Sequence, residues 1–262
     1  AAASEAHPTS PDGSTIPSAL RTLKLVTVNA DGLGSDYGHS AQSRLESILD
    51  SVLAFDPRVI CLQEVTMATY PVVTSRLATW AVQYRQRTTS EHFVVTAVHP
   101  ALSANVKFKS NAFPRTLDGR HALSAYFEGW AVVNVHLESG GQDSHAQVRV
   151  AQIEQLALWQ ERPECRSRNA VVIAGDFNLR EGEDGDMILE GWRDTGATEQ
   201  WAREWTWRRG ANRARYDRVS CIGRRACVVD CVAYSLLRDV WPDRTDHVAV
   251  GVALRAKGGS CL

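Results

Sequence analysis

Acidic, amide and imidazole side chains recur in this sequence where apolar segments end. The apolar run at residues 171–175 is followed directly by Asp176 and Asn178. A single Asp-x-Asn after such a run usually forms an ordinary turn. Five comparable junctions in one chain are hard to explain as turns, because the polar residues at all of them are types that bind metal ions and phosphates. The sequence therefore indicates a catalytic site at strand ends.

The other four junctions supply the rest of this polar set. They carry Asn29 and Asp31, then Glu64, then His136 with Ser139, and finally Asp246-His247 just before the last apolar run. Strands hold side chains rigidly while the following loops shape a cleft, so strand ends are where a fold gathers functional groups.

The acids and the amide suit a hard divalent cation. Mg²⁺ takes oxygen ligands, few of them from protein, and keeps places for water and phosphate. We expect Glu64 to be the direct ligand, with Asn29 as a neutral oxygen donor and Asp31 acting through water. Mn²⁺ is a possible substitute for Mg²⁺ at such a site.

The remaining groups suit hydrolysis of a phosphodiester. We expect Asp176 to make the attacking water basic, and Asn178 and His247 to donate hydrogen bonds to the phosphate. His136 is expected to contact a phosphate oxygen or the leaving group. Asp246 is expected to fix the tautomer and orientation of a histidine.

Apolar periodicity predicts the elements that position these residues. Residues 23–30, 59–65, 170–175, 216–222, 227–237 and 247–254 are predicted strands. Residues 92–100 and 103–113 are expected to form one hairpin, and 121–129 and 130–139 another. Residues 39–55 and 144–162 are predicted amphipathic helices, the first capped by Ser40 and the second turning Val148, Ile153, Leu156 and Trp159 toward the core.

This order of elements predicts an α/β fold with four layers, in which two mainly antiparallel sheets are flanked by helices. Residues 1–20 are expected to be a flexible tail. No linker rich in Pro, Gly or Ser divides the remainder, so residues 21–262 are predicted to be a single catalytic domain.

Composition limits the classes of partner. The formal net charge of −1 gives no general attraction to a polyanion, but arginines gather between residues 203 and 225 and could form a local basic patch. No apolar run reaches the length of a membrane helix, so no membrane partner is expected. The six cysteines lack the paired spacing of zinc sites.

In combination and in this order, the motifs resemble the endonuclease/exonuclease/phosphatase superfamily of metal-dependent phosphodiesterases, from Leu23 to about Leu254. The resemblance rests on Asn29-x-Asp31-Gly32-Leu33, Leu62-Gln63-Glu64-Val65, His136-Leu137-Glu138-Ser139, Gly175-Asp176-Phe177-Asn178-Leu179-Arg180 and Asp246-His247. It implies a DNase I-like sandwich with the catalytic roles described above. Val28 stands where the family usually has Trp and Thr245 where it often has Ser, and both changes leave the neighbouring chemical residue in place.

Narrower motifs resemble the branch of that superfamily that removes tyrosine from 5′ DNA ends. They are HLES, FPRTLDGR, GDFNLR, WTW and RYDR. This resemblance implies a substrate with a single-stranded 5′ end joined to the tyrosine of a trapped topoisomerase II, and a 5′-phosphate product. It implies a monomeric DNA-repair enzyme of the nucleus, or of the cytoplasm.

The same resemblance implies five substrate contacts. Ser139 would donate to the phosphate, and Arg120 and Arg180 would shape the site around the phosphate and the tyrosine. Trp207 and Tyr216 would wall the groove for DNA, where stacking contributes about 1–3 kcal/mol per base.

Two alternatives stay open. Substrate choice is made by loops, so the chain could be an abasic endonuclease, a DNase-like nuclease, a deadenylase or a phospholipid phosphodiesterase. It could also be a non-catalytic binding module that keeps the fold. Such a module would be expected to lack a ligand, yet all of Asn29, Glu64, His136, Asp176, Asn178 and His247 are present.

Overall fold

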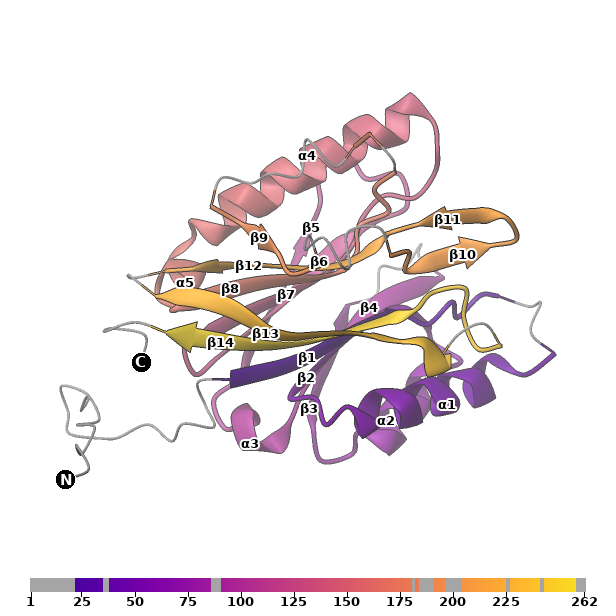
Figure 1. The fold of residues 1–262 in the computed structure, drawn as a ribbon, viewed down its shortest axis with the longest axis horizontal. Coiled ribbons are helices and arrows are strands. Elements are labelled where there is room, and N and C mark those ends of the chain that lie inside the picture. The colour runs from indigo at the N-terminus through magenta and orange to yellow at the C-terminus, as the bar shows by residue number, and fades with distance from the viewer. Residues whose placement is uncertain are drawn as a thin grey trace, which may run out of the picture.

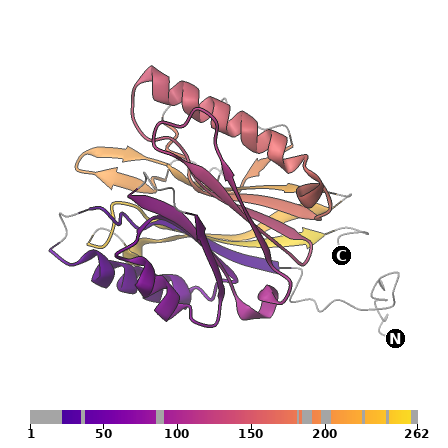
Figure 2. The same cartoon turned by 180° about the vertical axis from the view of Figure 1, so that it is seen from behind.

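The computed structural model describes residues 22–34, 38–85, 91–180, 182–183, 191–196, 204–224, 227–240 and 243–257. Within this part, two six-stranded sheets pack face to face and helices cover their outer faces (Figures 1 and 2). The predicted tail, residues 1–20, lies outside the described residues, and the single catalytic domain stays a prediction. No helix in the described ranges has the length and apolar character needed to cross a membrane.

The first sheet has the strand order β13-β14-β1-β2-β4-β3. Its parallel pair, β1 and β2, is joined through helix α1, and its other neighbouring strands are antiparallel. The elements of this half are β1 (Thr22–Asn29), α1 (Ala41–Ala54), β2 (Val59–Thr66), α2 (Tyr70–Arg76), β3 (Ala81–Arg85), β4 (His92–Val98), α3 (Pro100–Ser103), β13 (Val228–Leu237), the 3₁₀ helix η3 (Arg238–Val240) and β14 (Ala249–Lys257).

The second sheet repeats this plan with the order β5-β6-β7-β8-β12-β9. Its parallel pair, β7 and β8, is joined through helix α4. The elements are β5 (Lys107–Ala112), β6 (His121–Phe127), β7 (Trp130–His136), α4 (Asp143–Gln160), α5 (Pro163–Arg166), β8 (Ala170–Asp176), β9 (Arg193–Asp194) and β12 (Asp217–Gly223). A separate ribbon of β10 (Trp207–Arg209) and β11 (Asn212–Ala214) extends from one end of the sandwich (Figure 1).

Three apolar clusters separate the four layers. One fills the space between the sheets, with Leu25, Val132 and Val250 among its members. A second packs α1 and α2 against the first sheet, and a third packs α4 and α5 against the second. The central strands are therefore covered on both faces, which explains why they are apolar almost throughout. The predicted four-layer α/β sandwich is confirmed.

A buried polar seam crosses the apolar space between the sheets. Asn134 Oδ1 in β7 accepts a hydrogen bond from Gln63 Nε2 in β2 at 2.7 Å. Asn134 Nδ2 donates to the Val95 carbonyl oxygen at 2.9 Å, and Gln63 Nε2 donates to Thr27 Oγ1 at 3.0 Å. A slip of one sheet over the other would leave the buried amide of Asn134 and its partners in the first sheet unpaired, at roughly 1–3 kcal/mol for each group. The seam therefore fixes the relative position of the two sheets.

The prediction that residues 92–100 and 103–113 form a hairpin was wrong. β4 pairs with β2 and β3 in the first sheet, whereas β5 pairs with β6 in the second. The chain crosses between the sheets after β4, and local alternation of apolar residues carries no information about which sheet a strand joins. The second predicted hairpin is confirmed, since β6 pairs with β7 through a two-residue turn.

The two long helices form where the sequence predicted them, but the buried face of α4 differs from the prediction. Ser40 caps α1 as predicted, because its Oγ accepts from the N–H of Ser43 at 3.2 Å. In α4, Ile153, Leu156 and Trp159 are buried, but Val148 is only half-buried. Arg149 and Gln152 are buried beside them instead.

Gly175 is a position at which the packing of β7 against β8 admits no side chain. Its φ is +150°, and a Cβ atom there would lie 1.9 Å from the Val135 carbonyl oxygen. We expect Gly175→Ala to lower Tm and to displace Asp176, because the backbone must move away from β7. Gly210→Ala is the matched control, since Gly210 has a φ of +61° with open space around it and the substitution carries only the left-handed penalty of about 1–2 kcal/mol. Equal melting temperatures would contradict the steric argument.

Candidate active site

A cleft of about 990 Å³ opens where β1, β7 and β8 end. Both sheets contribute to it, so its shape depends on how they pack. Its lining includes every predicted site residue except Asn29, which is buried: Asp31, Glu64, Arg120, His136, Ser139, Asp176, Asn178, Arg180, Trp207, Tyr216, Asp246 and His247.

Asn29, the last residue of β1, holds two carboxylates together. Its Nδ2 donates to Glu64 Oε1 and to Asp176 Oδ2, both at 3.0 Å. Its Oδ1 accepts from the N–H of Asp31 at 2.9 Å. The amide therefore positions the two acids, and the oxygen that was expected to face a metal ion is engaged with the backbone.

Glu64 reaches the cleft because β2 is irregular at this point. The pairing of β2 with β4 shifts register between Leu62 and Val65, and Glu64 has a φ of +55°. The N–H of Gly32 donates to the Glu64 carbonyl at 3.1 Å, and a Cβ at Gly32 would lie 2.2 Å from that oxygen. The glycine next to Asp31 is thus required for the close approach of the two loops.

The carboxylates of Glu64 and Asp31 are suitable oxygen ligands for a hard divalent cation. Burial raises the pKa of Glu64, and the neighbouring charges of Asp31 and Asp176 raise it further, against the Asn29 hydrogen bond and the charge of His247. A desolvated group of like charges is stabilised by a bound cation. Both carboxylates line the cleft, so these two residues are the ones that would hold the metal.

Asp176 is aligned through both of its oxygens. Besides the Asn29 contact, its Oδ1 accepts from the N–H of Asn178 at 2.8 Å. Asn178 has a φ of +51°, and its Nδ2 donates to the Leu137 carbonyl at 3.1 Å. The turn after β8 therefore serves to orient Asp176 and to tie its loop to the one that follows β7.

His136 is a neutral donor. Its Nδ1 lies 2.8 Å from Nη1 of Arg120, and because a guanidinium only donates, the ring proton must be on Nε2. Burial lowers the pKa of His136 well below its ordinary value, and the charge of Arg120 lowers it further. Nε2 lies 3.6 Å from Asp176 Oδ2 and 3.8 Å from Glu64 Oε1. His136 therefore presents an N–H at the acids without carrying a charge.

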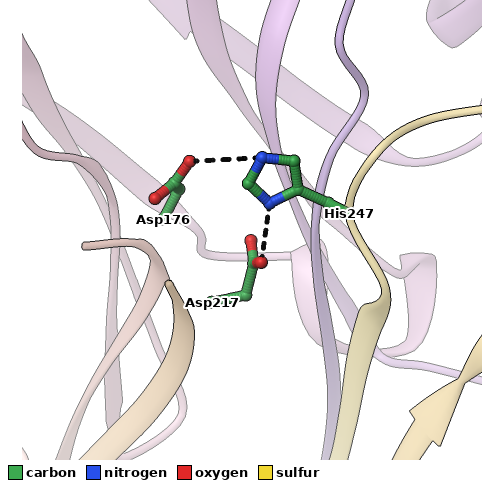
Figure 3. Close-up of side chains that lie close together, drawn as sticks. All are labelled: Asp176, Asp217 and His247. Atoms are coloured by element: carbon green, nitrogen blue, oxygen red, sulfur yellow. Dashed lines mark hydrogen bonds and ion pairs between the residues drawn. The ribbon is translucent and has the colours of Figure 1, made fainter. Parts of the chain in front are cut away.

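Whereas His136 is neutral, His247 lies between Asp217 and Asp176 (Figure 3) and is positively charged. Its Nδ1 lies 2.7 Å from Asp217 Oδ2, and its Nε2 lies 3.8 Å from Asp176 Oδ2. Burial opposes the charged form, but the carboxylates of Asp217, Asp176 and Asp246 outweigh it and raise the pKa of His247 to about 10. The ring is an imidazolium. Although ligand atoms of Asp176, Asp217 and His247 lie within 4.8 Å of one another, a protonated ring cannot bind a metal.

Asp217, and not Asp246, accepts the hydrogen bond that orients the ring of His247, which is the role that the sequence predicted for Asp246. Asp246 Oδ1 lies 3.6 Å from Nε2 of His247, on the side that faces the cleft. Its Oδ2 accepts from Trp207 Nε1 at 2.8 Å. Asp217 fixes the ring of His247 instead, because the pairing of β12 with β8 sets Asp217 opposite Asp176. The sequence signal that could have identified Asp217 was an acid near the start of the predicted strand 216–222.

The loop after residue 113 brings Arg120 and Ser139 together. Arg120 Nη2 donates to Asp118 Oδ2 at 3.1 Å and to Ser139 Oγ at 3.2 Å. The buried carboxylate of Glu138 accepts from Thr116 Oγ1 at 2.8 Å and from the N–H groups of residues 117 and 118. Glu138 thereby shapes the loop that carries Arg120.

One wall of the cleft is aromatic and basic. The rings of Trp207 and Tyr216 have centroids 5.1 Å apart, and Tyr216 lies 6.5 Å from the ring of His247. Arg209 and Arg213, on the β10–β11 ribbon, line the same cleft. Arg180 also lines it, with its Nε donating to the Gly140 carbonyl at 3.1 Å. Arg203 and Arg225, which bound the predicted basic patch, lie outside the described residues.

The site has contributors that sequence reasoning did not identify. His92 lines the cleft, with its ring centroid 5.4 Å from that of His136. Burial lowers the pKa of His92 to about 4, with Arg120 adding to the effect. Asp217 was missed as well, whereas the ribbon arginines lie within the basic cluster that the sequence indicated between residues 203 and 225. A histidine at the start of a strand is too common to be selected from sequence alone.

Known proteins are similar to the chain in sequence and in fold. Tyrosyl-DNA phosphodiesterase 2 from Rattus norvegicus is 26% identical over 231 residues, which is 80% of this chain and 60% of that protein. The crystal structure of D. rerio TDP2 with a single-strand DNA product has a TM-score of 0.70 at 23% identity, with 89% and 99% of the two chains covered. The human Nocturnin catalytic domain with bound sulfate has a TM-score of 0.67 at 17% identity, with 90% and 95% covered.

At these identities the structural likeness establishes the fold. The profile of the Endonuclease/Exonuclease/phosphatase family matches residues 26–257, which include both sheets except the first four residues of β1, and every cleft residue named above. The chain belongs to the Endonuclease/Exonuclease/phosphatase family.

Proposed function

We propose that this phosphodiesterase hydrolyses the bond between a tyrosine side chain and the 5′ phosphate of DNA, leaves a 5′-phosphate, and acts on trapped topoisomerase II. The proposal is supported by the 26% identity to rat tyrosyl-DNA phosphodiesterase 2. The observation that carries it is the wall formed by Trp207 and Tyr216 beside the acids, because phosphodiester hydrolysis in general needs no such wall. Stacking of bases on aromatic rings next to arginines suits single-stranded DNA.

Proton transfer to Asp176 starts the reaction in this proposal. A water whose proton Asp176 accepts attacks phosphorus, the bond from phosphorus to the tyrosine oxygen breaks, and the electron pair leaves with the phenolate. A phenol has a pKa of about 10, so the leaving group needs less help from an acid than an alcohol would. Nε2–H of His136 and the imidazolium of His247 donate to the non-bridging oxygens, on which negative charge grows.

Glu64 and Asp31 would hold a divalent cation, which we propose to be Mg²⁺. When bound, it would supply positive charge next to the phosphate. Asn29 Nδ2 donates a hydrogen bond to Glu64 and another to Asp176, and each donor–acceptor distance is 3.0 Å. The metal-holding acid and the proton-accepting acid are therefore set in place by one side chain.

The first test is hydrolysis of an oligonucleotide with a 5′-phosphotyrosyl end, with Mg²⁺ or with EDTA. We expect release of a 5′-phosphate end that stops with EDTA and falls by roughly 10⁴-fold or more in Asp176→Asn. Asp143→Asn, an exposed acid at the start of α4, is the matched control and should leave the rate unchanged. Cleavage of abasic DNA, poly(A) or a phospholipid headgroup in place of the tyrosyl end would move the function to another branch of the family.

The charge of His247 predicts the pH dependence of the reaction. The folded-state pKa of about 10 lies above the ordinary 6.5. The charged ring therefore stabilises the fold fully below pH 6.5, and this contribution disappears as pH rises through about 10. Activity should fall over the same alkaline range.

Asp217→Asn tests this assignment. The variant loses the neighbouring charge that raises the pKa of His247, so its alkaline loss of activity should begin at a lower pH than in the wild type. The measurement is kcat/KM against pH, with Asp143→Asn as the control. An alkaline limb at the same pH in Asp217→Asn and wild type would show that His247 is not the titrating group.

The ribbon arginines predict how affinity depends on DNA length and on salt. Arg209→Ala and Arg213→Ala should raise KM for a tyrosyl oligonucleotide and reduce the slope of log affinity against log salt by roughly 0.7 for each phosphate that is no longer neutralised. A tyrosyl ester of a single nucleotide should be cleaved as before. Arg166→Ala, exposed on α5, is the control. Equal losses for the long and the short substrate would contradict a role in holding DNA.

A further inference from the structure

Two arginines on the helical layers are almost completely buried. Arg44 in α1 is 2% exposed and Arg149 in α4 is 1% exposed, and they head the largest fully buried side chains in the described ranges. Burial of a guanidinium is unfavourable unless its donors are satisfied, so both need a structural reason. Neither has a role in the chemistry described above.

Arg44 binds the backbone of two loops at the cleft. Its Nη2 donates to the carbonyl oxygens of Asp31 at 3.0 Å and Gly34 at 2.7 Å. Its Nη1 donates to the carbonyl of Arg244 at 2.7 Å. One guanidinium thus joins the loop of the proposed metal ligand Asp31 to the loop that leads into Asp246 and His247.

Arg149 binds the two corresponding loops of the second sheet. Its Nη1 donates to the carbonyl oxygens of Glu138 at 2.9 Å and Gly140 at 3.0 Å, on either side of Ser139. Its Nε and Nη2 form a paired contact with the Glu183 carboxylate at 2.8 and 2.7 Å. Glu183 and the Gly140 carbonyl also accept hydrogen bonds from Arg180. Arg149 thus holds both the Ser139 loop and Arg180.

The topology explains why each helix carries such a residue. α1 connects the parallel strands β1 and β2, and α4 connects the parallel strands β7 and β8. A crossover helix begins next to the end of the strand that precedes it, so its first turns lie over the loops at that edge. Arg44 and Arg149 lie in the first half of their helices, where a long side chain can reach those loops.

We propose that Arg44 and Arg149 are positioning residues with separate tasks. Arg44 sets the metal-holding half of the cleft by fixing the Asp31 loop against the loop before His247. Arg149 sets the phosphate-holding half by fixing Ser139 and Arg180. The terms metal-holding and phosphate-holding rest on the proposed function, whereas the fixing of these loops does not.

The test compares Arg44→Met and Arg149→Met with two controls from the same helices. Leu49→Ala in α1 and Leu156→Ala in α4 remove buried apolar contacts but none of the hydrogen bonds by which the arginines hold the cleft loops. They destabilise the fold but should keep the kinetics of the folded enzyme. Arg44→Lys and Arg149→Lys keep the buried charge but lose the planar guanidinium and its several N–H donors. These variants can be used in the same test if the methionine variants do not fold.

Steady-state kinetics on the tyrosyl oligonucleotide should separate the two tasks. Arg44→Met should raise the Mg²⁺ concentration for half-maximal activity by about 10-fold or more. It should also lower kcat through the His247 loop, with a smaller effect on KM for the oligonucleotide. Arg149→Met should raise that KM by a similar factor and leave the Mg²⁺ dependence unchanged. Parallel changes of both quantities in both variants would overturn the division of tasks.

Hydrogen–deuterium exchange tests the loop contacts without substrate. Arg44→Met should increase exchange in residues 31–34 and 243–247, and Arg149→Met in residues 138–140, 178–180 and 182–183, beyond any increase in the leucine controls. The same exchange in the arginine and leucine variants would overturn the proposal. This measurement stands even if the wild type cleaves no tyrosyl ester, so failure of the proposed function is distinguishable from failure of the positioning role.

Discussion

The amide of Asn29 is the contact on which the rest of the site depends. It joins Glu64 from its own sheet to Asp176 from the other, and so sets these two acids at a fixed separation. This arrangement works only if the sheets keep one relative position. The Asn134–Gln63 seam supplies that constraint from within the apolar core. A buried hydrogen bond between amides tolerates little displacement, so the precision of the site comes from the sandwich itself.

The environment gives the imidazoles of His136 and His247 different charges. Arg120 donates to His136 and excludes a second proton from that ring, whereas Asp217 accepts from His247 and retains one. Both rings are buried and both face Asp176, so their nearest partners decide the outcome. In the proposed reaction, one neutral donor and one cation would limit the total positive charge next to the acids while keeping two N–H groups available for the phosphate.

The sequence was informative where the signal is local. Apolar runs identified nearly all the long strands, and the polar residues that end them identified the cleft, because a strand end places the next side chain at the edge of the sheet. The separation of β4 from β5 was not predictable, since each strand could pair in either sheet. Asp217 was missed for a related reason: its contact with His247 depends on the register of β12 against β8. Arg149 and Gln152 were missed because polar residues at helical positions are ordinarily exposed.

The wall formed by Trp207 and Tyr216 is attached to the loop that carries Asp246 and His247. The N–H of Arg208 donates to the Asp246 carbonyl at 3.0 Å, and Trp207 forms an isolated bridge with His247. Thr206 Oγ1 accepts from the N–H of Asp217 at 2.8 Å, so the start of the ribbon also contacts the partner of His247. In the proposed function, a base that stacked on Trp207 and displaced it would therefore also disturb the His247–Asp217 pair. These contacts all involve residues 206–208, so substitutions at Arg209 and Arg213 should affect hydrolysis less than substitutions at those three residues.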